Sequence, residues 1–297
     1  MAPIVLFVYN RTDHLRLTIE ALLLNELAEA SDLVVYSDAA KNAASESSVA
    51  EVRAFLATVS GFKTIKIIHR EANYGLAKSV ISGVTEVLRD YESVIVLEDD
   101  LITSPNFLRY MNDALTVYEQ DERVVSVHGY IYPVQTVLPE VFFLPGADCW
   151  GWATWRRGWR LFNGDGRALL AELERRKLSH AFDFDGSYPY TQMLRDQVAG
   201  KNSSWAIRWY ASAFLAEKLT LYPGRSLVRN IGNDDSGTHC GDTDLYDVEL
   251  ALHPLDVEDA SVVASEVGRQ AFIRFFRANA DTWVVRVLRR VKRLVKG

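Results

Sequence analysis

Three consecutive carboxylates, Glu98, Asp99 and Asp100, follow the apolar run of residues 94–97. Neighbouring carboxylates repel one another strongly unless a cation or a basic group neutralises them. Oxygen-rich acidic sites suit Mg²⁺ or Mn²⁺, which bind through one or two carboxylates together with the phosphate oxygens of a ligand. Alternation along an extended chain puts Glu98 and Asp100 on one side and Asp99 on the other. The triplet is therefore a candidate metal site.

A helix N-terminus offers a second explanation for the same triplet. Thr103 or Ser104 can cap a helix predicted over residues 107–118, and acids close to it interact favourably with the positive end of the helix dipole. The residue types alone leave a metal site and a capping cluster both open.

Polar side chains also follow two earlier apolar runs. Tyr9, Asn10 and Arg11 come after the first run, and Asp38 comes after the second. A carboxylate such as Asp38 can accept a hydrogen bond from a nucleotide base, while Arg11 can pair with it or hold ribose and phosphate. The alternative for both residues is an ordinary turn aspartate with a solvated arginine.

A fourth cluster consists of Asn73, Gly75 and Lys78, at the point where a helical pattern begins. Free backbone N–H groups at a helix N-terminus, together with a lysine, can face a diphosphate. A single glycine-containing loop is also common without any ligand, so this cluster gains its weight from the other three.

The elements that must position these clusters alternate along the first half of the chain. Strands are predicted at residues 4–9, 33–36, 64–69 and 93–97, and helices at residues 14–29, 48–60 and 76–90. This alternation is typical of βαβ units and a mainly parallel sheet. Ligands of such sheets bind beyond the carboxyl ends of the strands, which is where all four polar clusters fall.

The order of these motifs resembles that of the GT-A glycosyltransferases. The resemblance rests on Asp38 after the second strand, on Asn-Tyr-Gly-Leu-Ala at residues 73–77, and on Val-Leu-Glu-Asp-Asp-Leu at residues 96–101 followed by Pro-Asn-Phe at residues 105–107. It is greatest to the N-acetylglucosaminyltransferase I type and to bacterial polysaccharide-building relatives. It is specific from residue 4 to about residue 110 and looser over residues 141–241.

The resemblance implies a hexosyl- or N-acetylhexosaminyltransferase that moves a sugar from a nucleotide diphosphate, UDP-linked in the family, to an acceptor hydroxyl. A bound Mn²⁺ or Mg²⁺ stabilises the departing diphosphate in such enzymes. By the same resemblance Asp100 binds the metal, Asp38 reads the base, and Arg11 and Asp99 belong to the nucleotide site. The resemblance also implies that His239, in a late glycine-containing loop at residues 230–239, completes the metal shell or touches the diphosphate; an ordinary surface-loop histidine is the alternative.

The second half of the chain should supply the acceptor side. An aromatic and glycine loop at residues 145–153 resembles the family loop that lies against the donor sugar, with Trp150 and Gly151 close to it and Trp150 and Trp152 able to stack on a pyranose. A packed aromatic hinge is the alternative explanation for this loop.

The catalytic base is not where the family pattern puts it. Residues 203–206, at the start of the predicted helix, read Ser-Ser-Trp-Ala and contain no acid. An inverting transfer needs a base within hydrogen-bond reach of the acceptor hydroxyl. We rank Asp185 and Asp196 first because they precede the helix in a polar segment, with Asp183 and Asp148 as further candidates. A retaining mechanism, or none, stays open.

Net charge, cysteine content and the C-terminal sequence limit the classes of partner and the compartment that the chain suits. A net charge of −6 argues against general nucleic-acid binding. The two cysteines, Cys149 and Cys240, are far apart, which favours a reducing, cytoplasmic compartment. Residues 281–296 combine apolar residues at helical spacing with six basic ones, typical of an amphipathic helix at a membrane surface. Such a helix favours peripheral contact with the inner face of the cytoplasmic membrane and a lipid-linked glycan acceptor; a helix docked on the catalytic domain is the alternative.

We therefore predict an α/β protein of the GT-A, single Rossmann-like type, with a mainly parallel sheet flanked by helices and a C-terminal amphipathic helical segment. Its predicted parts are a glycosyltransferase domain over residues 1–250, divided into a nucleotide-binding half (1–128) and an acceptor-side half (129–250), and a helical extension over residues 251–297. The alternatives are an inactive sugar-nucleotide-binding partner protein and a nucleotidyltransferase. The latter would carry a glycine-rich loop directly after the first strand, and residues 10–13 contain no glycine.

Overall fold

The strands at the centre of the fold are buried on both faces. The computed structural model describes residues 1–234, 243–258 and 260–295. In β1 (Ile4–Val8) all five residues are buried. Its even-numbered residues belong to one hydrophobic cluster, whereas Val5 and Phe7 belong to another on the opposite face. A strand without polar positions needs cover on both sides, as in α/β proteins.

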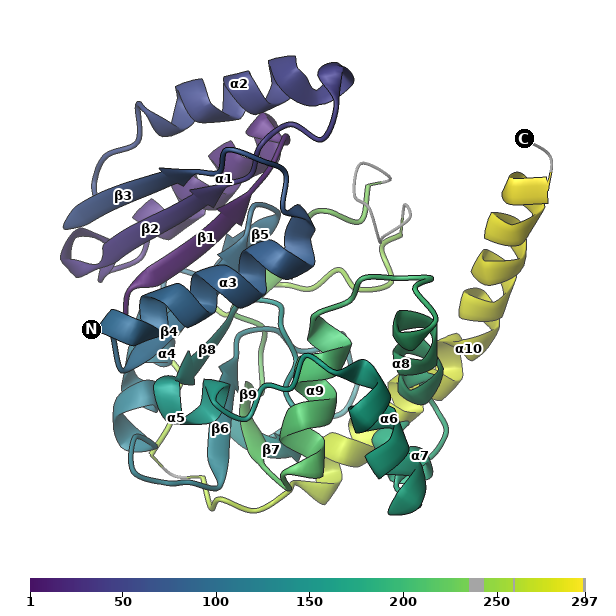
Figure 1. Ribbon diagram of the computed structural model, residues 1–297. Coiled ribbons are helices and arrows are strands. Elements are labelled where there is room, and N and C mark those ends of the chain that lie inside the picture. The colour runs from purple at the N-terminus through teal and green to yellow at the C-terminus, as the bar shows by residue number, and fades with distance from the viewer. Residues whose placement is uncertain (235–242, 259, 296–297) are drawn as a thin grey trace.

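One sheet of eight strands runs through the molecule in the order β3-β2-β1-β4-β8-β6-β9-β7 (Figure 1). Besides β1 it contains β2 (Asp32–Ser37), β3 (Thr64–His69), β4 (Ser93–Glu98), β6 (Val124–His128), β7 (Val141–Pro145), β8 (Trp152–Trp155) and β9 (Leu219–Pro223). The first four strands pair in parallel, as do β6 and β9. β8 runs antiparallel to both β4 and β6, and β7 runs antiparallel to β9. The sheet is therefore mixed and mostly parallel, as predicted.

Helices cover both faces of this sheet. The first cluster contains residues of α1 (Thr12–Leu23), α2 (Glu46–Leu56) and α4 (Phe107–Val117). The second contains residues of α3 (Gly75–Asp90), α5 (Arg156–Trp159) and α9 (Ala206–Leu215). Short 3-10 turns follow α1 and β2, at Ala28–Ala30 and Ala43–Ser45. The carboxyl ends of β1, β2 and β4 are thus held by layers packed from two sides.

A third cluster forms beside β7 and β9. It joins α9 to α6 (Gly166–Arg175), α7 (Ser179–Phe182), α8 (Tyr190–Val198) and the start of α10 (Glu266–Val295). Phe272, Ile273 and Phe276 of α10 are buried there. Beyond this contact α10 runs out from the body of the molecule toward the C-terminus (Figure 1).

The strands and helices predicted for the first half lie within four residues of their predicted ends, except that the helix predicted to end at residue 29 ends at Leu23. Among the strands that were not predicted, β5 (Leu101–Thr103) and β10 (Val228–Asn230) form an antiparallel pair. The N-cap residue of α4 is Asn106, so neither Thr103 nor Ser104 is its cap, and β5 separates the acidic triplet from this helix. The capping explanation is therefore wrong.

The predicted division at residue 128 falls within a continuous sheet, since β4 pairs with β8 from the second half. The helix predicted from residue 281 begins earlier, at Glu266. Within the described ranges we find no helix with both the length and the apolarity needed to cross a bilayer. The division into domains remains a prediction.

Candidate functional site

Arg11 joins two carboxylates of the acidic triplet at the carboxyl ends of β1 and β4. Its Nη2 donates to Asp99 Oδ1 at 2.5 Å and to Asp100 Oδ2 at 2.8 Å. The Thr18 hydroxyl donates to the backbone carbonyl of Asp99, and the Tyr9 amide donates to Asp99 Oδ2. β1, α1 and the end of β4 therefore meet at one charged cluster.

The expected alternation of the triplet does not hold. β4 ends at Glu98 and the chain turns at the next two residues before entering β5. Side-chain alternation needs an extended backbone, so the turn lets Asp99 and Asp100 converge on one guanidinium instead of facing opposite ways.

Three acids around one arginine leave this cluster short of positive charge. Burial and then the charges of Asp100 and Asp99 raise the pKa of Glu98 to about 8. Burial raises the pKa of Asp99 as well, against the opposing charge of Arg11. Burial lowers the pKa of Arg11, but the charges of Asp99 and Asp100 outweigh it, so the net change is upward. A further cation would relieve this imbalance.

The donor chemistry of the cluster fits Mg²⁺ or Mn²⁺, which take hard oxygen ligands and keep positions for phosphate and water. Within the described ranges, no group of three or more His, Cys, Asp or Glu side chains is arranged to hold a metal ion. Asp100 is more exposed than Asp99, with its side chain 14% exposed against 7%. The protein's share of such a site would thus be Asp100, with other ligands from substrate.

The other terminal nitrogen of Arg11, Nη1, could donate a hydrogen bond to an anionic ligand. Nη1 is buried and has no hydrogen-bond partner among the described residues. Buried donors are rarely left unpaired in proteins. A phosphate oxygen would satisfy this donor and would bring its charge next to the guanidinium.

The described beginning of the late loop packs against the same cluster. The Ile231 amide donates to the carbonyl of Asp100 at 2.9 Å. His14 Nε2 lies 3.1 Å from Asp234 Oδ2. A Cβ on Gly232 would collide with Asp100 Oδ2, so only glycine allows this approach. His239, the second predicted metal ligand, lies outside the described residues.

Asp38 holds the loop that precedes α3. Its carboxylate accepts hydrogen bonds from the amides of Tyr74 and Gly75, both at 2.8 Å, from Asn73 Nδ2 at 3.1 Å and from the Ala39 amide at 3.0 Å. Asp38 is buried. The amides expected to be free for a diphosphate are therefore bound to Asp38, and the predicted base contact of Asp38 would have to share these oxygens.

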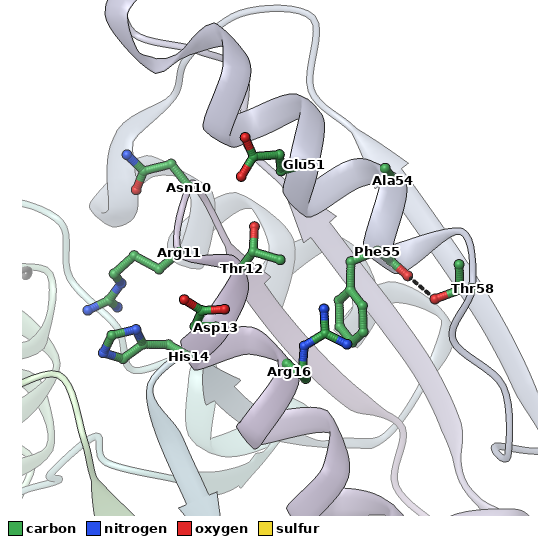
Figure 2. Close-up of a pocket in the computed structure, with 10 residues that line it drawn as sticks. All are labelled: Asn10, Arg11, Thr12, Asp13, His14, Arg16, Glu51, Ala54, Phe55 and Thr58. Carbon is green, nitrogen blue, oxygen red and sulfur yellow. Dashed lines mark hydrogen bonds between the residues drawn. The ribbon is translucent and has the colours of Figure 1, made fainter.

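The other predicted nucleotide residues lie around the same edge of the sheet. The Tyr9 hydroxyl donates to Ser45 Oγ at 3.0 Å. Lys78 is exposed, with Nζ 3.7 Å from the centre of the Tyr74 ring. Asn10 and Arg11 line a cavity of about 810 Å³ between the start of α1 and α2. Figure 2 shows Arg11 and His14 turned to the same side, away from α2.

The aromatic loop before β8 is held close to the end of β4. β8 pairs with β4 so that Trp152 lies opposite Val96. The Trp150 amide donates to His128 Nε2 at 3.1 Å, and Gly151, at φ +61°, accepts from the amide of Gly129 at 2.7 Å. Burial lowers the pKa of His128 to about 3, so it accepts this bond as a neutral ring.

The two tryptophans of this loop differ in exposure. Trp150 is partly exposed, and its ring centre lies 4.7 Å from that of Tyr130. Trp152 is buried among other tryptophan rings, 5.5 Å from Trp205 and 6.0 Å from Trp209. Stacking of a sugar on Trp152 is therefore wrong, because its face is already covered, whereas Trp150 remains available.

The acids ranked first as catalytic base have other partners. Asp185 forms a two-pronged ion pair with Arg269, both bonds at 2.8 Å, and these bonds lower the pKa of Asp185. Asp196 accepts from Gln192 and Lys201 on the outer side of α8. Asp183 accepts from the amide and hydroxyl of Thr191. The roles of Asp185 and Asp196 remain predictions, without support from these contacts.

Asp148 has a different environment from these three acids. It is partly exposed, and its Oδ2 accepts a hydrogen bond from the Tyr222 hydroxyl at 2.9 Å. Burial raises the pKa of Asp148 to about 6, although the bond from Tyr222 acts in the opposite direction. An aspartate in an aromatic loop gives no sequence signal of this kind, because Tyr222 lies on β9, 74 residues away.

Comparisons with solved structures give only remote likenesses. A mannosyltransferase from Pyrobaculum calidifontis, in complex with GDP-Man and Mn²⁺, is 13% identical with a TM-score of 0.41, over 72% of this chain and 70% of that one. The TarS protein of S. aureus is 14% identical with a TM-score of 0.39, over 79% of this chain but 38% of its own. Mouse xyloside xylosyltransferase 1 is 12% identical with a TM-score of 0.36, over 64% of this chain and 77% of that one. TM-scores below 0.5 carry no argument about function.

No curated protein matches the chain in sequence. The GNT-I family, in contrast, matches residues 1–131, the part that contains β1 to β6 and the Arg11 cluster. This match, over 131 of the 297 residues, confirms the resemblance found in the strand-end motifs: residues 1–131 are similar to the GNT-I family.

Proposed function

We propose that this chain is a metal-dependent glycosyltransferase that moves a sugar from a nucleoside diphosphate, UDP above all, to a hydroxyl of a glycan or lipid-linked acceptor. The observation that carries the proposal is the Arg11 cluster: one guanidinium bridges Asp99 and Asp100 while its buried Nη1 stays unpaired. A cluster that is short of positive charge and holds a spare donor suits a metal together with a diphosphate.

In this proposal each residue of the site has a separate role. Arg11 Nη1 donates to a phosphate oxygen, and Asp99 keeps the guanidinium in place from within the fold. Asp100 would hold Mn²⁺ or Mg²⁺, an ion that would supply positive charge next to the leaving diphosphate. Asp38 fixes the loop of residues 73–75 below the nucleotide.

The C-terminal segment supports a second part of the proposal. Residues 286–296 contain six basic residues in a chain whose net charge is −6. α10 carries this segment away from the body of the molecule (Figure 1). We propose that it contacts an anionic lipid surface at the inner face of the cytoplasmic membrane, which would bring a lipid-linked acceptor to the enzyme.

The donor site can be tested by calorimetric titration of the protein with UDP and GDP, in Mn²⁺, in Mg²⁺ and in EDTA. We expect one nucleotide to bind only with metal, and Asp100→Asn to weaken that binding at least tenfold. Asp113→Asn removes an exposed carboxylate from α4 and serves as the matched control. Binding without any turnover would favour the inactive partner protein, and no binding under any condition would contradict the proposal.

A further inference from the structure

A group of tyrosines surrounds Asp148. In the sequence, Asp148 is far from the residues of the Arg11 cluster. Asp148 lies in the loop between β7 and β8. Burial and, in addition, the negative charge of this aspartate raise the pKa of five tyrosines, Tyr130, Tyr132, Tyr190, Tyr210 and Tyr222. These come from four separate parts of the fold, namely the segment after β6, α8, α9 and β9. Among the described residues, Asp148 is thus the charged group that all five rings have in common.

Part of this group is open to solvent. Tyr190, Tyr210 and Tyr222 are buried and form the inner side. Tyr132, Trp150, Tyr188 and Tyr246 are partly exposed, as is Asp148 itself. The Tyr246 ring lies 5.8 Å from Trp150 and 6.1 Å from Tyr132. Partly exposed rings beside a carboxylate offer a pyranose both a stacking surface and a hydrogen-bond acceptor.

The register of the sheet places Asp148 near the predicted donor site. Because Trp152 lies opposite Val96, the residues before β8 lie next to the end of β4, where Asp99 and Asp100 follow. An added Cβ on Gly151 would be 3.4 Å from Leu97, which shows how close the two segments are. Asp148 is three residues from Gly151 and so lies within about 11 Å of it. Asp148 therefore belongs to the segment that approaches the end of β4, the strand that Asp99 and Asp100 follow.

Building on the glycosyltransferase proposed above, we propose that Asp148 is the general base of the transfer and that the partly exposed rings around it receive the acceptor sugar. The acceptor hydroxyl gives its proton to the Asp148 carboxylate while its oxygen forms a bond to the anomeric carbon. The bond from that carbon to the diphosphate breaks, and its electron pair leaves with the nucleoside diphosphate. In the absence of an acceptor, water takes the place of the hydroxyl.

The environment of Asp148 supports this role. A general base works best when its pKa lies near the working pH. The pKa of Asp148, about 6 because of burial, leaves the group mostly ionised at pH 7 while it remains a stronger base than an exposed aspartate. Tyr222 orients the carboxylate through its hydrogen bond to Oδ2. Asp185, in contrast, has both oxygens bound to Arg269.

The test measures the release of UDP from a panel of UDP-hexoses and UDP-N-acetylhexosamines in the presence of Mn²⁺. Water serves as the acceptor. We expect Asp148→Asn to lower the rate on the order of 10²- to 10⁴-fold. Binding of UDP with Mn²⁺, measured separately by calorimetry, should stay within about twofold of wild type, which shows that the variant is folded. Asp185→Asn is measured beside it as the competing assignment.

The pH dependence gives a second readout. The wild-type rate should rise with pH through about 6 and then level off, because the base must be ionised. Asp148→Asn should lack this rise, and Tyr222→Phe should move it to higher pH because the bond from Tyr222 lowers the pKa of Asp148.

Three results would overturn the inference while leaving the donor site intact: wild-type rates in Asp148→Asn, loss of rate in Asp185→Asn instead, or UDP binding without UDP release from any donor. Failure of the wild-type protein to bind UDP at all would instead remove the proposed function, and this inference with it.

Discussion

Replacing Arg11 by alanine removes the one guanidinium that bridges Asp99 and Asp100. The three side chains are 19%, 7% and 14% exposed, respectively. Removing one partner of a buried ion pair costs 3–5 kcal/mol because the remaining charge stays unpaired. Since Arg11 and Asp100 keep some contact with solvent, we take the lower end, about 3 kcal/mol. At about 2–4 °C for each kcal/mol, the midpoint of thermal unfolding should fall by about 6–12 °C.

The control for this experiment is Arg16→Ala, on α1, the helix whose N-cap residue is Arg11. Arg16 is exposed, and its guanidinium lies 4.7 Å from the centre of the Phe55 ring. Its removal changes the net charge equally but leaves the acidic cluster intact, so the cost should stay below about 1 kcal/mol. Unfolding in urea at pH 7, followed by far-ultraviolet circular dichroism, measures both variants.

The pH dependence of the Arg11→Ala deficit gives a further check. Without Arg11 the folded-state pKa of Asp99 rises further above its unfolded value, since Arg11 opposes the effect of burial. A raised folded-state pKa means that stability is lost as pH increases. The deficit relative to wild type should therefore be larger at pH 8 than at pH 5. Equal, pH-independent losses in Arg11→Ala and Arg16→Ala would refute this account of the cluster.

Three further predictions concern other parts of the molecule. Asp38→Asn places an NH₂ group against some of the four donors that the carboxylate accepts, and urea unfolding should show a loss of about 1–3 kcal/mol. Burial raises the pKa of Asp148 to about 6, so the stability of the wild-type protein falls as pH rises from about 4 to 6. Asp148→Asn should lack this fall, so in denaturant titrations its stability relative to wild type should increase over that pH range. Reversing the charges of Arg289 and Arg293 to glutamate should weaken co-sedimentation with phosphatidylglycerol vesicles by at least about tenfold, whereas equal binding of both proteins would count against the membrane proposal.

The sheet and its helices could be predicted because their signals are local. Residues 4–8 and 94–97 are apolar without interruption, which indicates strands buried on both faces, and the structure buries them so. Gly75 begins α3 at the predicted place. β5 and β10 were missed because each has three residues and is stabilised by pairing between segments more than 120 positions apart.

The side-chain contacts at the candidate site could not be predicted, because they join residues that are far apart in the sequence. The clustering of polar residues at the strand ends was predictable from alternation of strands and helices. That Arg11 binds both Asp99 and Asp100 was not, because it follows from a turn directly after Glu98. Asp185 was ranked as a base from its polar neighbourhood, but Arg269, 84 residues later, occupies its carboxylate.

The central claim is that a metal ion and a nucleoside diphosphate bind together at the Arg11 cluster. Anomalous X-ray scattering from a crystal grown with UDP and Mn²⁺ locates the metal directly. The account predicts one manganese peak at coordination distance from a carboxylate oxygen of Asp100 and from diphosphate oxygens, with Arg11 Nη1 bonded to a phosphate oxygen. A manganese ion or UDP bound away from Asp100 and Arg11 would contradict it.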